Sequence, residues 1–251
     1  MRDLVRRVLP RRLGRQRILA GPLRGRRLVT SWHDYPAAIT GRTELPLLRW
    51  FAANARTGET WLDVGGHYGY TALALAERVG PGGRVFTFEP VVASAGCIAQ
   101  TRVLNGLDQI VVVPLGLGSP ESLEVKRLPI MRGMADLTLE DRPDHASWDC
   151  IQIARFDWLW PRLSAGNPVV HGVKIDVQGM ELEVLAGMSD LLRLQKPALV
   201  VELHRGVDRA RLLELLVGAG YSPAATRIDA SPEQSRTTFS DDCSYAFVAT
   251  T

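Results

Sequence analysis

A glycine-rich segment headed by an acid, Asp63-Val-Gly65-Gly66-His67-Tyr68-Gly69, is the first feature whose residue types and spacing could bind a ligand. Glycine tolerates positive φ and lets the backbone approach a ligand closely. The spacing D-x-G-x-x-x-G differs from the G-x-G-x-x-G that accommodates the pyrophosphate of a dinucleotide. An acid at the head of the turn would repel a pyrophosphate but suits an ammonium group, held directly or through water. We therefore expect Asp63 to bind the amino group of a ligand that carries an amino-acid moiety.

A second carboxylate, Glu89, directly follows an apolar run over 84–88, about 20 residues after the glycine turn. A carboxylate at the carboxyl end of a second strand can accept hydrogen bonds from both hydroxyls of a ribose. The turn and Glu89 together predict a nucleoside-type ligand. The alternative is an α/β protein in which the turn is structural and the acid caps a helix.

The elements that must position these residues follow from apolar runs that alternate with helical patterns from about residue 60. This alternation is typical of βαβ units and predicts an α/β fold with a doubly wound, mostly parallel seven-stranded sheet. A polar stretch over 114–156 interrupts the pattern, and we expect an inserted β-hairpin there, with strands over 122–128 and 150–154. The expected core strands are 61–64, 84–88, 109–113, 172–176 and 198–204, with an antiparallel edge pair over 221–228 and 244–249. The expected helices are 71–79, 92–104, 181–194 and 208–218.

The first 30 residues carry ten arginines and a single acid, Asp3. We therefore divide the chain into a basic N-terminal arm, 1–35, and one domain, 36–251. Such an arm suits anionic membrane or phosphate groups, or it is a solvated, partly disordered leader. Three scattered cysteines, without a CxxC pair, favour neither a disulfide framework nor a zinc site. With no apolar run long enough to span a membrane, we expect a cytoplasmic protein.

The motifs resemble those of the FkbM family of S-adenosylmethionine-dependent methyltransferases, which mostly modify hydroxyl groups of sugars and polyketides. The resemblance covers roughly residues 41–205. The block from Lys174 to Gly187, KIDVQGMELEVLAG, is the specific part, because nearly all class I methyltransferases share the glycine turn. The other matching segments are Gly41-Arg-Thr-Glu44, Asp63-Val-Gly65 through Gly69-Tyr70, Phe88-Glu89-Pro90, Leu104-Asn105 and Val201-Glu202-Leu203-His204.

The resemblance implies a Rossmann-like class I methyltransferase fold with S-adenosyl-L-methionine as cofactor. The residues it places around the cofactor are Glu44, Asp63, Gly65, Gly66, His67, Gly69 and Glu89. The chain departs from the family twice. Gly66-His67 stands where Ala-Asn is usual, and we expect His67 to border the cofactor in place of the Asn. Gln178 stands where Glu usually precedes Gly179, which removes a carboxylate near the expected active site.

Polar residues end two neighbouring strands of the predicted sheet, where parallel sheets bind their ligands. Asp176 is our first candidate to take the proton of an acceptor hydroxyl or to position that hydroxyl. Its alternative role is to accept backbone N–H groups at a helix start. His204 is the alternative base, unless it is merely packed. Asp176, Glu202 and His204 could also bind a divalent cation, but nothing in the spacing requires a metal and we expect none.

These features predict an S-adenosylmethionine-dependent O-methyltransferase acting on a hydroxyl of a sugar, glycolipid or polyketide-type natural product. The expected partner is thus a small-molecule or glycolipid acceptor. Trp148, Trp158 and Trp160 are candidates to line its pocket, although large aromatic residues are more often core. One alternative is an RNA methyltransferase that uses the Arg-rich arm, but the Asn/Asp-Pro-Pro-Tyr/Phe signature of base methylation does not follow the fourth core strand. The other alternative is a catalytically inactive binding protein of the same fold.

Overall fold

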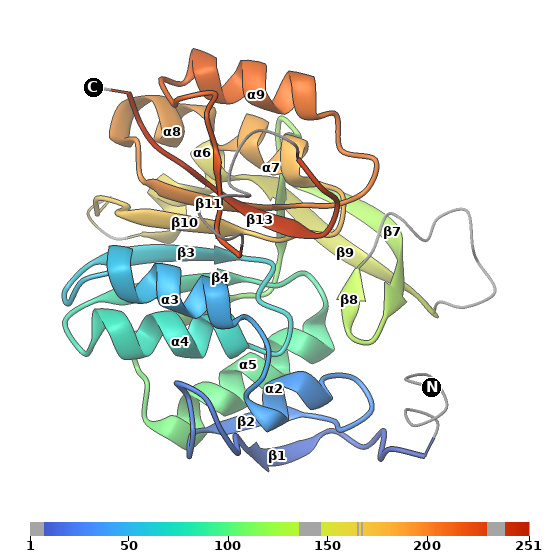
Figure 1. Ribbon diagram of the computed structural model, residues 1–251. Helices are drawn as coiled ribbons and strands as arrows, with labels where there is room; N and C mark the ends of the chain where they lie inside the picture. The colour runs from blue at the N-terminus through green and yellow to red at the C-terminus, as the bar shows by residue number, and fades with distance from the viewer. Residues whose placement is uncertain (1–7, 136–146, 165, 167, 230–238, 251) are drawn as a thin grey trace.

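A seven-stranded sheet forms the centre of the protein in the computed structural model, which describes residues 8–135, 147–164, 166, 168–229 and 239–250 (Figure 1). The strand order is β12-β13-β11-β10-β3-β4-β5. Pairings are parallel from β11 to β5, and β13 is antiparallel to both of its neighbours. The strands are β3 (Thr60–Val64), β4 (Arg84–Phe88), β5 (Ile110–Val113), β10 (Gly172–Ile175), β11 (Ala198–Leu203), β12 (Thr226–Arg227) and β13 (Cys243–Phe247).

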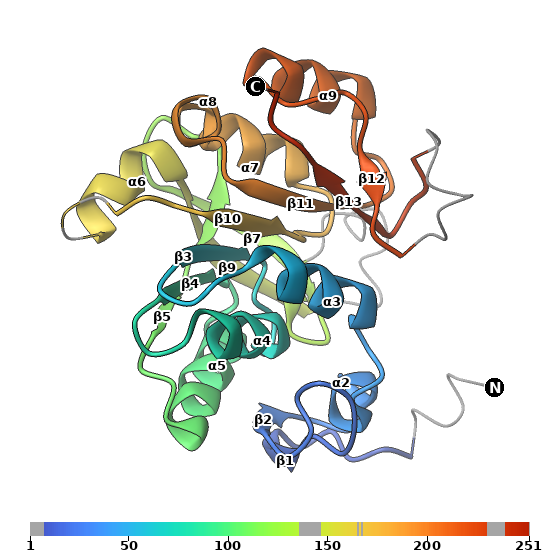
Figure 2. The ribbon, with the colours of Figure 1, turned by 60° about the vertical axis from the view of Figure 1, so that its left-hand side comes forward.

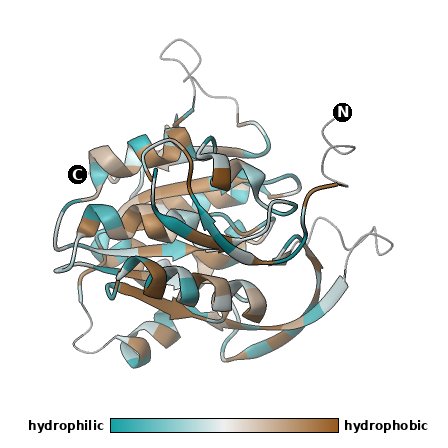
Figure 3. Cartoon of the chain, turned by 90° about the horizontal axis from the view of Figure 1, so that it is seen from below, coloured by the Kyte–Doolittle hydropathy of each residue, from teal (hydrophilic) through white to brown (hydrophobic). Residues whose placement is uncertain are grey.

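Helices cover both faces of this sheet (Figures 1 and 2). One face carries α3 (Leu45–Asn54), α4 (Tyr70–Val79) and α5 (Val92–Asn105), and the other carries α6 (Phe156–Leu163), α7 (Glu181–Gly187), α8 (Ser189–Gln195) and α9 (Arg209–Gly218). A sheet covered on both sides needs strands that are apolar on both faces, and all five residues of β3 are buried. Figure 3 shows the hydrophobic residues concentrated on the central strands. The α/β fold with seven strands is therefore confirmed.

The inserted hairpin is present and belongs to a larger second sheet, in the order β6-β9-β7-β8. Its strands β7 (Glu124–Met131) and β9 (Ser147–Arg155) pair antiparallel, while β6 (Gly116–Gly118) pairs parallel with β9 and β8 (Met134–Ala135) pairs with β7. Residues 136–146 of the predicted polar loop lie outside the described residues. Helix α6 follows β9 directly, in a stretch for which we predicted no helix.

Two predicted elements differ from the observed ones. The helix expected over 181–194 is two helices, α7 and α8, that meet at Met188. A Cβ on Gly187 would lie 1.8 Å from the carbonyl oxygen of Gly118 in β6, so the chain needs a glycine where α7 crosses that strand. The edge strand expected over 221–228 is reduced to β12 and an isolated bridge from Tyr221 to Ala249, with Pro223, which has no N–H for a ladder, between them.

The described part of the N-terminal arm is folded against the domain. Strands β1 (Gly14–Arg17) and β2 (Arg27–Thr30) form an antiparallel pair, and α2 (Pro36–Thr40) follows. The hairpin packs on α5, where the buried Thr101 hydroxyl accepts the Val29 N–H at 2.9 Å. Asn105 accepts the Arg27 N–H at 2.9 Å and donates to the Arg27 carbonyl at 2.7 Å. The buried apolar side chains of the hairpin pack with those of α4 in one hydrophobic core; they are Ile18, Leu23 and Leu28.

No helix among the described residues is both long enough and apolar enough to span a membrane. The cytoplasmic location inferred from the sequence stays a prediction.

We expect Thr101→Val to loosen the N-terminal hairpin. Valine keeps the shape of threonine but leaves the buried Val29 N–H without an acceptor, which costs about 1–3 kcal/mol. Urea denaturation should show this loss in the free energy of unfolding, and limited trypsin digestion should cut faster at the arginines of β1 and β2.

Thr57→Val is the matched control, because Thr57 is exposed and the same chemical change there should alter the free energy of unfolding by less than about 0.5 kcal/mol. Equal stability of the two variants would contradict the proposed docking.

Candidate active site

A cavity of about 300 Å³ opens at the carboxyl ends of β3, β4, β10 and β11. This is the edge at which a doubly wound sheet binds its ligands. Of the sequence-predicted residues, the cavity is lined by Glu44, Gly65, Gly66, His67, Glu89 and Asp176. Asp63, Gly69 and His204 are not among its lining residues but lie directly behind the wall that those residues form.

The glycine turn is tight enough to exclude side chains at two positions. A Cβ on Gly65, whose φ is +83°, would lie 1.7 Å from the carbonyl oxygen of Asp176. A Cβ on Gly66 would lie 2.2 Å from the Thr87 hydroxyl oxygen. Gly69, with φ of +87°, forms the N-cap of α4. The turn therefore packs directly against the end of β10, so the two halves of the site share one wall.

The carboxylate of Asp63 is completely buried, and its hydrogen-bond and ion-pair partners are groups of the protein. It accepts hydrogen bonds from the hydroxyls of Thr71, at 3.0 and 3.1 Å, and Thr87, at 3.1 Å. The ammonium group of Lys174 lies 3.3 Å from its Oδ1. Asp63 thus supports the turn from behind, and the ligand contact expected of it, direct or through water, stays a prediction.

Glu89 faces the cavity from the end of β4, as predicted. Its Oε2 accepts the His67 N–H at 2.7 Å, and its Oε1 accepts the Val91 N–H at 2.9 Å. Burial raises the pKa of Glu89 to about 8, against these two backbone hydrogen bonds, which lower it. Each oxygen keeps a second acceptor position, so the carboxylate can still bind a pair of hydroxyl groups.

His67 borders the cavity in a left-handed conformation, with φ of +49°. Burial lowers its pKa to about 4, so the ring is neutral and its Nε2–H donates to the carbonyl oxygen of Arg132 at 2.9 Å. The ring also contacts Tyr35 and Tyr68, with ring centroids 5.0 and 4.2 Å away. His67 thus links the glycine turn to the segment that follows β7.

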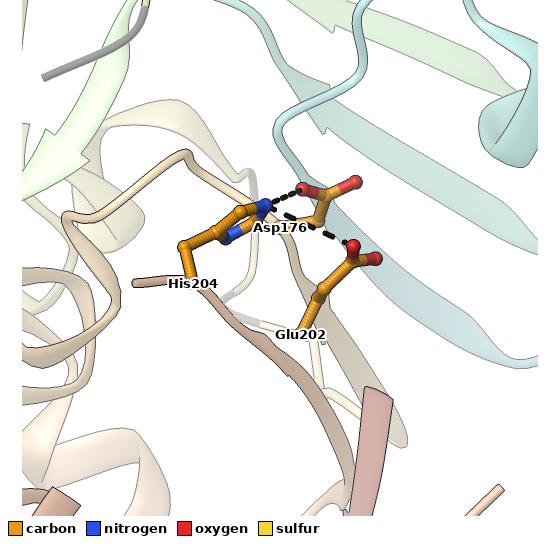
Figure 4. Close-up of side chains that lie close together, drawn as sticks. All are labelled: Asp176, Glu202 and His204. Carbon is orange, nitrogen blue, oxygen red and sulfur yellow. Dashed lines mark ion pairs between the residues drawn. The ribbon is translucent and has the colours of Figure 1, made fainter. Parts of the chain in front are cut away.

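Asp176, Glu202 and His204 gather where β10 and β11 end (Figure 4). The Nε2 atom of His204 lies 3.6 Å from Asp176 Oδ1 and 3.8 Å from Glu202 Oε1. Asp176 and Glu202 line the cavity, whereas His204 is only 5% exposed and stands behind them. The structure therefore brings together the two residues predicted to act in catalysis, with Asp176 in front.

The other face of His204 is anchored on a buried acid. Glu181, which is 0% exposed, accepts from His204 Nδ1 at 2.7 Å. Burial alone lowers the pKa of His204, but the Glu181 hydrogen bond and the nearby carboxylates outweigh it and raise the pKa to about 9. The charge of Asp176, followed by burial, raises the pKa of Glu202 to about 8. The Gln178 amide nitrogen lies 2.9 Å from His204 Nε2.

Sequence reasoning missed three contributors to the site. Lys174 was recognised only as part of a motif, yet it is the cation that joins Asp63 to Asp176. Tyr35 and Arg132 line the cavity from segments that carry no motif. The three tryptophans considered for an acceptor pocket, or alternatively for the core, are not among the residues that line this cavity. Trp160 is buried against Phe86 and Phe156 in the core, whereas Trp148 and Trp158 stack with arginines away from the cavity.

Comparison with known proteins places the chain in a family. Residues 63–223, more than half of the chain, match the model described as the methyltransferase FkbM domain. The hexuronic acid methyltransferase AglP of Haloferax volcanii is 26% identical over 198 residues, which cover 75% of this chain and 74% of that protein. Methyltransferase 1 of Beauveria bassiana is 26% identical over 193 residues, covering 68% of this chain and 75% of its own length.

A solved structure shows the same fold. The crystal structure of Methyltransferase FkbM from Methylobacillus flagellatus KT superimposes with a TM-score of 0.50 at 18% identity. The match covers 79% of this chain, which spans half the length of the solved one. With the family model matching most of the catalytic domain, this protein is an S-adenosylmethionine-dependent methyltransferase that belongs to the FkbM family.

Proposed function

We propose that the protein transfers a methyl group to a hydroxyl of a sugar, glycolipid or polyketide-type acceptor. The observation that carries this proposal is the presence, in one cavity, of the Glu89 carboxylate at one end and the Asp176–Glu202 pair at the other. The first suits the ribose of the cofactor and the second a hydroxyl acceptor. Similarity to a hexuronic acid methyltransferase supports an acceptor of the sugar class.

The cavity fits S-adenosylmethionine in its hydrogen-bonding groups. Both oxygens of Glu89 are fixed by backbone N–H groups from behind, so their remaining acceptor positions are turned to receive the two ribose hydroxyls. The glycine turn lines the cavity with Gly65, Gly66 and His67, so His67 is the only one of these three that brings a side chain to it. When bound, the cofactor supplies a methyl group on a positively charged sulfonium.

The charge of the cavity also suits this ligand. Glu44, Asp176 and Glu202 all line it, and Lys174, the nearby buried cation, is shared between Asp63 and Asp176. Carboxylates in a partly buried site favour a cationic ligand. In this proposal Glu44, rather than the enclosed Asp63, lies nearest the ammonium group of the cofactor.

Asp176 is the group that reaches the acceptor. Its side chain is 28% exposed and lines the cavity, so it can accept the hydrogen of a hydroxyl and hold its oxygen toward the methyl group. His204 lies behind it, with Nε2 3.6 Å from Asp176 Oδ1. His204 therefore acts through Asp176, by fixing the carboxylate or sharing the proton that it receives.

Glu89→Gln should weaken the binding of S-adenosylhomocysteine by roughly 10- to 100-fold, because a hydrogen bond to a charged acceptor contributes about 1.5–3 kcal/mol. Isothermal titration calorimetry measures this directly. Glu214→Gln, a change of the same kind at an exposed position of α9, is the control and should bind as the unaltered protein does. Equal affinities for both variants would sink the assignment of Glu89.

Affinity for S-adenosylhomocysteine should also rise with pH. In the free protein burial keeps a proton on Glu89 up to a pKa of about 8, whereas accepting two hydroxyls requires the ionised form. Binding therefore releases this proton, and the affinity increases by at most about tenfold per pH unit until pH 8 and then levels off. Titrations in two buffers of different ionisation enthalpy count the released proton, and Glu89→Gln should release none. Proton uptake on binding would contradict the assignment.

Asp176→Asn should reduce methyl transfer by at least ~100-fold, the usual effect of losing a general base or positioning acid. The assay measures tritiated methyl transfer from S-adenosylmethionine to a panel of uronic acid and neutral hexose glycosides. Binding of S-adenosylhomocysteine should stay within a few-fold of that of the unaltered protein. Transfer at the original rate by Asp176→Asn would overturn the role given to this residue, and transfer only to RNA would overturn the acceptor class.

A further inference from the structure

The geometry points to a second ligand at this site: we propose that Asp176, Glu202 and His204 together bind one divalent cation of the Mn²⁺ class. One ligand atom from each residue lies within 4.8 Å of the others (Figure 4). An octahedral cation with bonds of about 2.1 Å separates its ligand atoms by about 3 Å at right angles and about 4 Å across. The 3.6 and 3.8 Å distances from His204 Nε2 to the two carboxylates lie in that range.

Each carboxylate presents one oxygen to this point and has the other held elsewhere. Asp176 Oδ2 lies 3.6 Å from the Lys174 ammonium, while its Oδ1 faces His204. Glu202 Oε2 accepts from the Ser244 hydroxyl at 3.4 Å, while its Oε1 faces His204. The two ligand oxygens are therefore oriented before any cation arrives, and the positive charge of Lys174 is on the far side of Asp176.

His204 is oriented by a carboxylate in the way that metal-binding histidines usually are. Its Nδ1 donates to Glu181 Oε1 at 2.7 Å, and Glu181 in turn accepts N–H groups from Val177 at 3.4 Å and Gly179 at 3.2 Å. With Nδ1 turned to Glu181, Nε2 is the ring nitrogen that faces the two carboxylates, and a cation that binds there replaces the proton on Nε2. Glu181 is fully buried. Its Oε1 makes the contact with His204, and its Oε2 has no hydrogen-bond partner.

A polar donor already lies at this point. The amide nitrogen of Gln178 is 2.9 Å from His204 Nε2 and 3.3 Å from Asp176 Oδ1. It donates to Asp176 Oδ1 and lies against His204 Nε2, so it occupies the point that two of the three proposed ligand atoms face. A cation takes the place of this donor when the Gln178 side chain turns away.

The donor set favours Mn²⁺ over the commoner hard cations. Carboxylate oxygens suit Mg²⁺, Ca²⁺ and Mn²⁺, and an imidazole nitrogen favours the transition metal among them. Three protein ligands leave coordination positions open on the cavity side, where Asp176 and Glu202 are exposed. The existence of the cation site does not depend on the proposed function, but the role we give the cation does. It would bind oxygens of the acceptor and lower the pKa of the acceptor hydroxyl. His204 would then be a metal ligand rather than a base.

Titration with MnCl₂ alone, followed by electron paramagnetic resonance on the full chain without cofactor or acceptor, tests the site. We expect one Mn²⁺ per chain, and at least ~10-fold weaker binding in Glu202→Gln and in His204→Asn. Glu181→Gln acts through His204 and should weaken Mn²⁺ by roughly 10- to 100-fold, with a shift of the His204 ring ¹⁵N resonances that shows a changed tautomer. Glu183→Gln, an exposed position on the same helix, should leave Mn²⁺ affinity unchanged.

Absence of Mn²⁺ binding at millimolar concentration would overturn the inference, as would unchanged affinity in both ligand variants. Circular dichroism melts establish that each variant is folded, and the conservative Glu202→Asp keeps a carboxylate should Glu202→Gln unfold. Titration of the same samples with S-adenosylhomocysteine separates the two proposals. Cofactor binding without Mn²⁺ binding defeats only the cation site, whereas Mn²⁺ binding without cofactor binding defeats only the proposed function.

Discussion

The ammonium group of Lys174 is the contact on which the rest of the site depends. It donates to the carbonyl oxygens of Gly65, at 2.7 Å, and Val64, at 3.3 Å, and it lies 3.3 Å from Asp63 and 3.6 Å from Asp176. Burial opposes the charge, but the neighbouring carboxylates outweigh burial and raise the pKa of Lys174. A buried charge that loses its partner is strongly destabilising, so β3, the glycine turn and β10 are stable only when assembled together.

This arrangement explains why the two halves of the site are joined. The Lys174 contact places the Gly65 backbone against the end of β10, where a Cβ on Gly65 would strike the Asp176 carbonyl. The glycine turn and the end of β10 that carries Asp176 therefore form one tightly packed wall. Methyl transfer requires the donor and acceptor to be closely aligned, and under the proposed function this shared wall would hold both.

The sequence predicted the strands and helices that repeat along the chain, because apolar periodicity follows directly from burial on two faces of a sheet. It also placed Glu89, His67 and Asp176 at the edge of the sheet where the cavity lies, since Glu89 and Asp176 directly follow strands and His67 lies within the glycine turn. It could not show that Asp63 is enclosed. That enclosure depends on Thr71, Thr87 and Lys174, which come from three separate elements and meet only in the folded chain.

Sequence reasoning also failed where a segment has no regular spacing of apolar residues or where contacts between distant parts of the chain decide its structure. Gly187, which ends α7 just before the break, lies too close to β6 to carry a Cβ, a contact between distant parts of the chain. The apolar residues of the Arg-rich arm are irregularly spaced, so no strand period marks the hairpin in the sequence. The hairpin nevertheless buries Ile18, Leu23 and Leu28. Aromatic type alone did not distinguish a pocket from a core, and Trp160 belongs to the core.

The carboxylates gathered at the ends of β10 and β11 destabilise the fold by their mutual repulsion and burial, and this bears on function. Asp176 and Glu202 repel one another there, and Glu181 lies fully buried beside them with one oxygen lacking a partner. Packing does not require charged residues at these positions, because a protein with well-packed apolar residues of similar volume there is often at least as stable. A Glu usually stands in the FkbM family where this chain has Gln178, and the amide here reduces the negative charge and lies 2.9 Å from His204 Nε2. Lys174 and His204 offset part of this repulsion, and a cation or a hydrogen-bond-donating ligand would offset more of it, which is the physical basis for proposing a ligand site here.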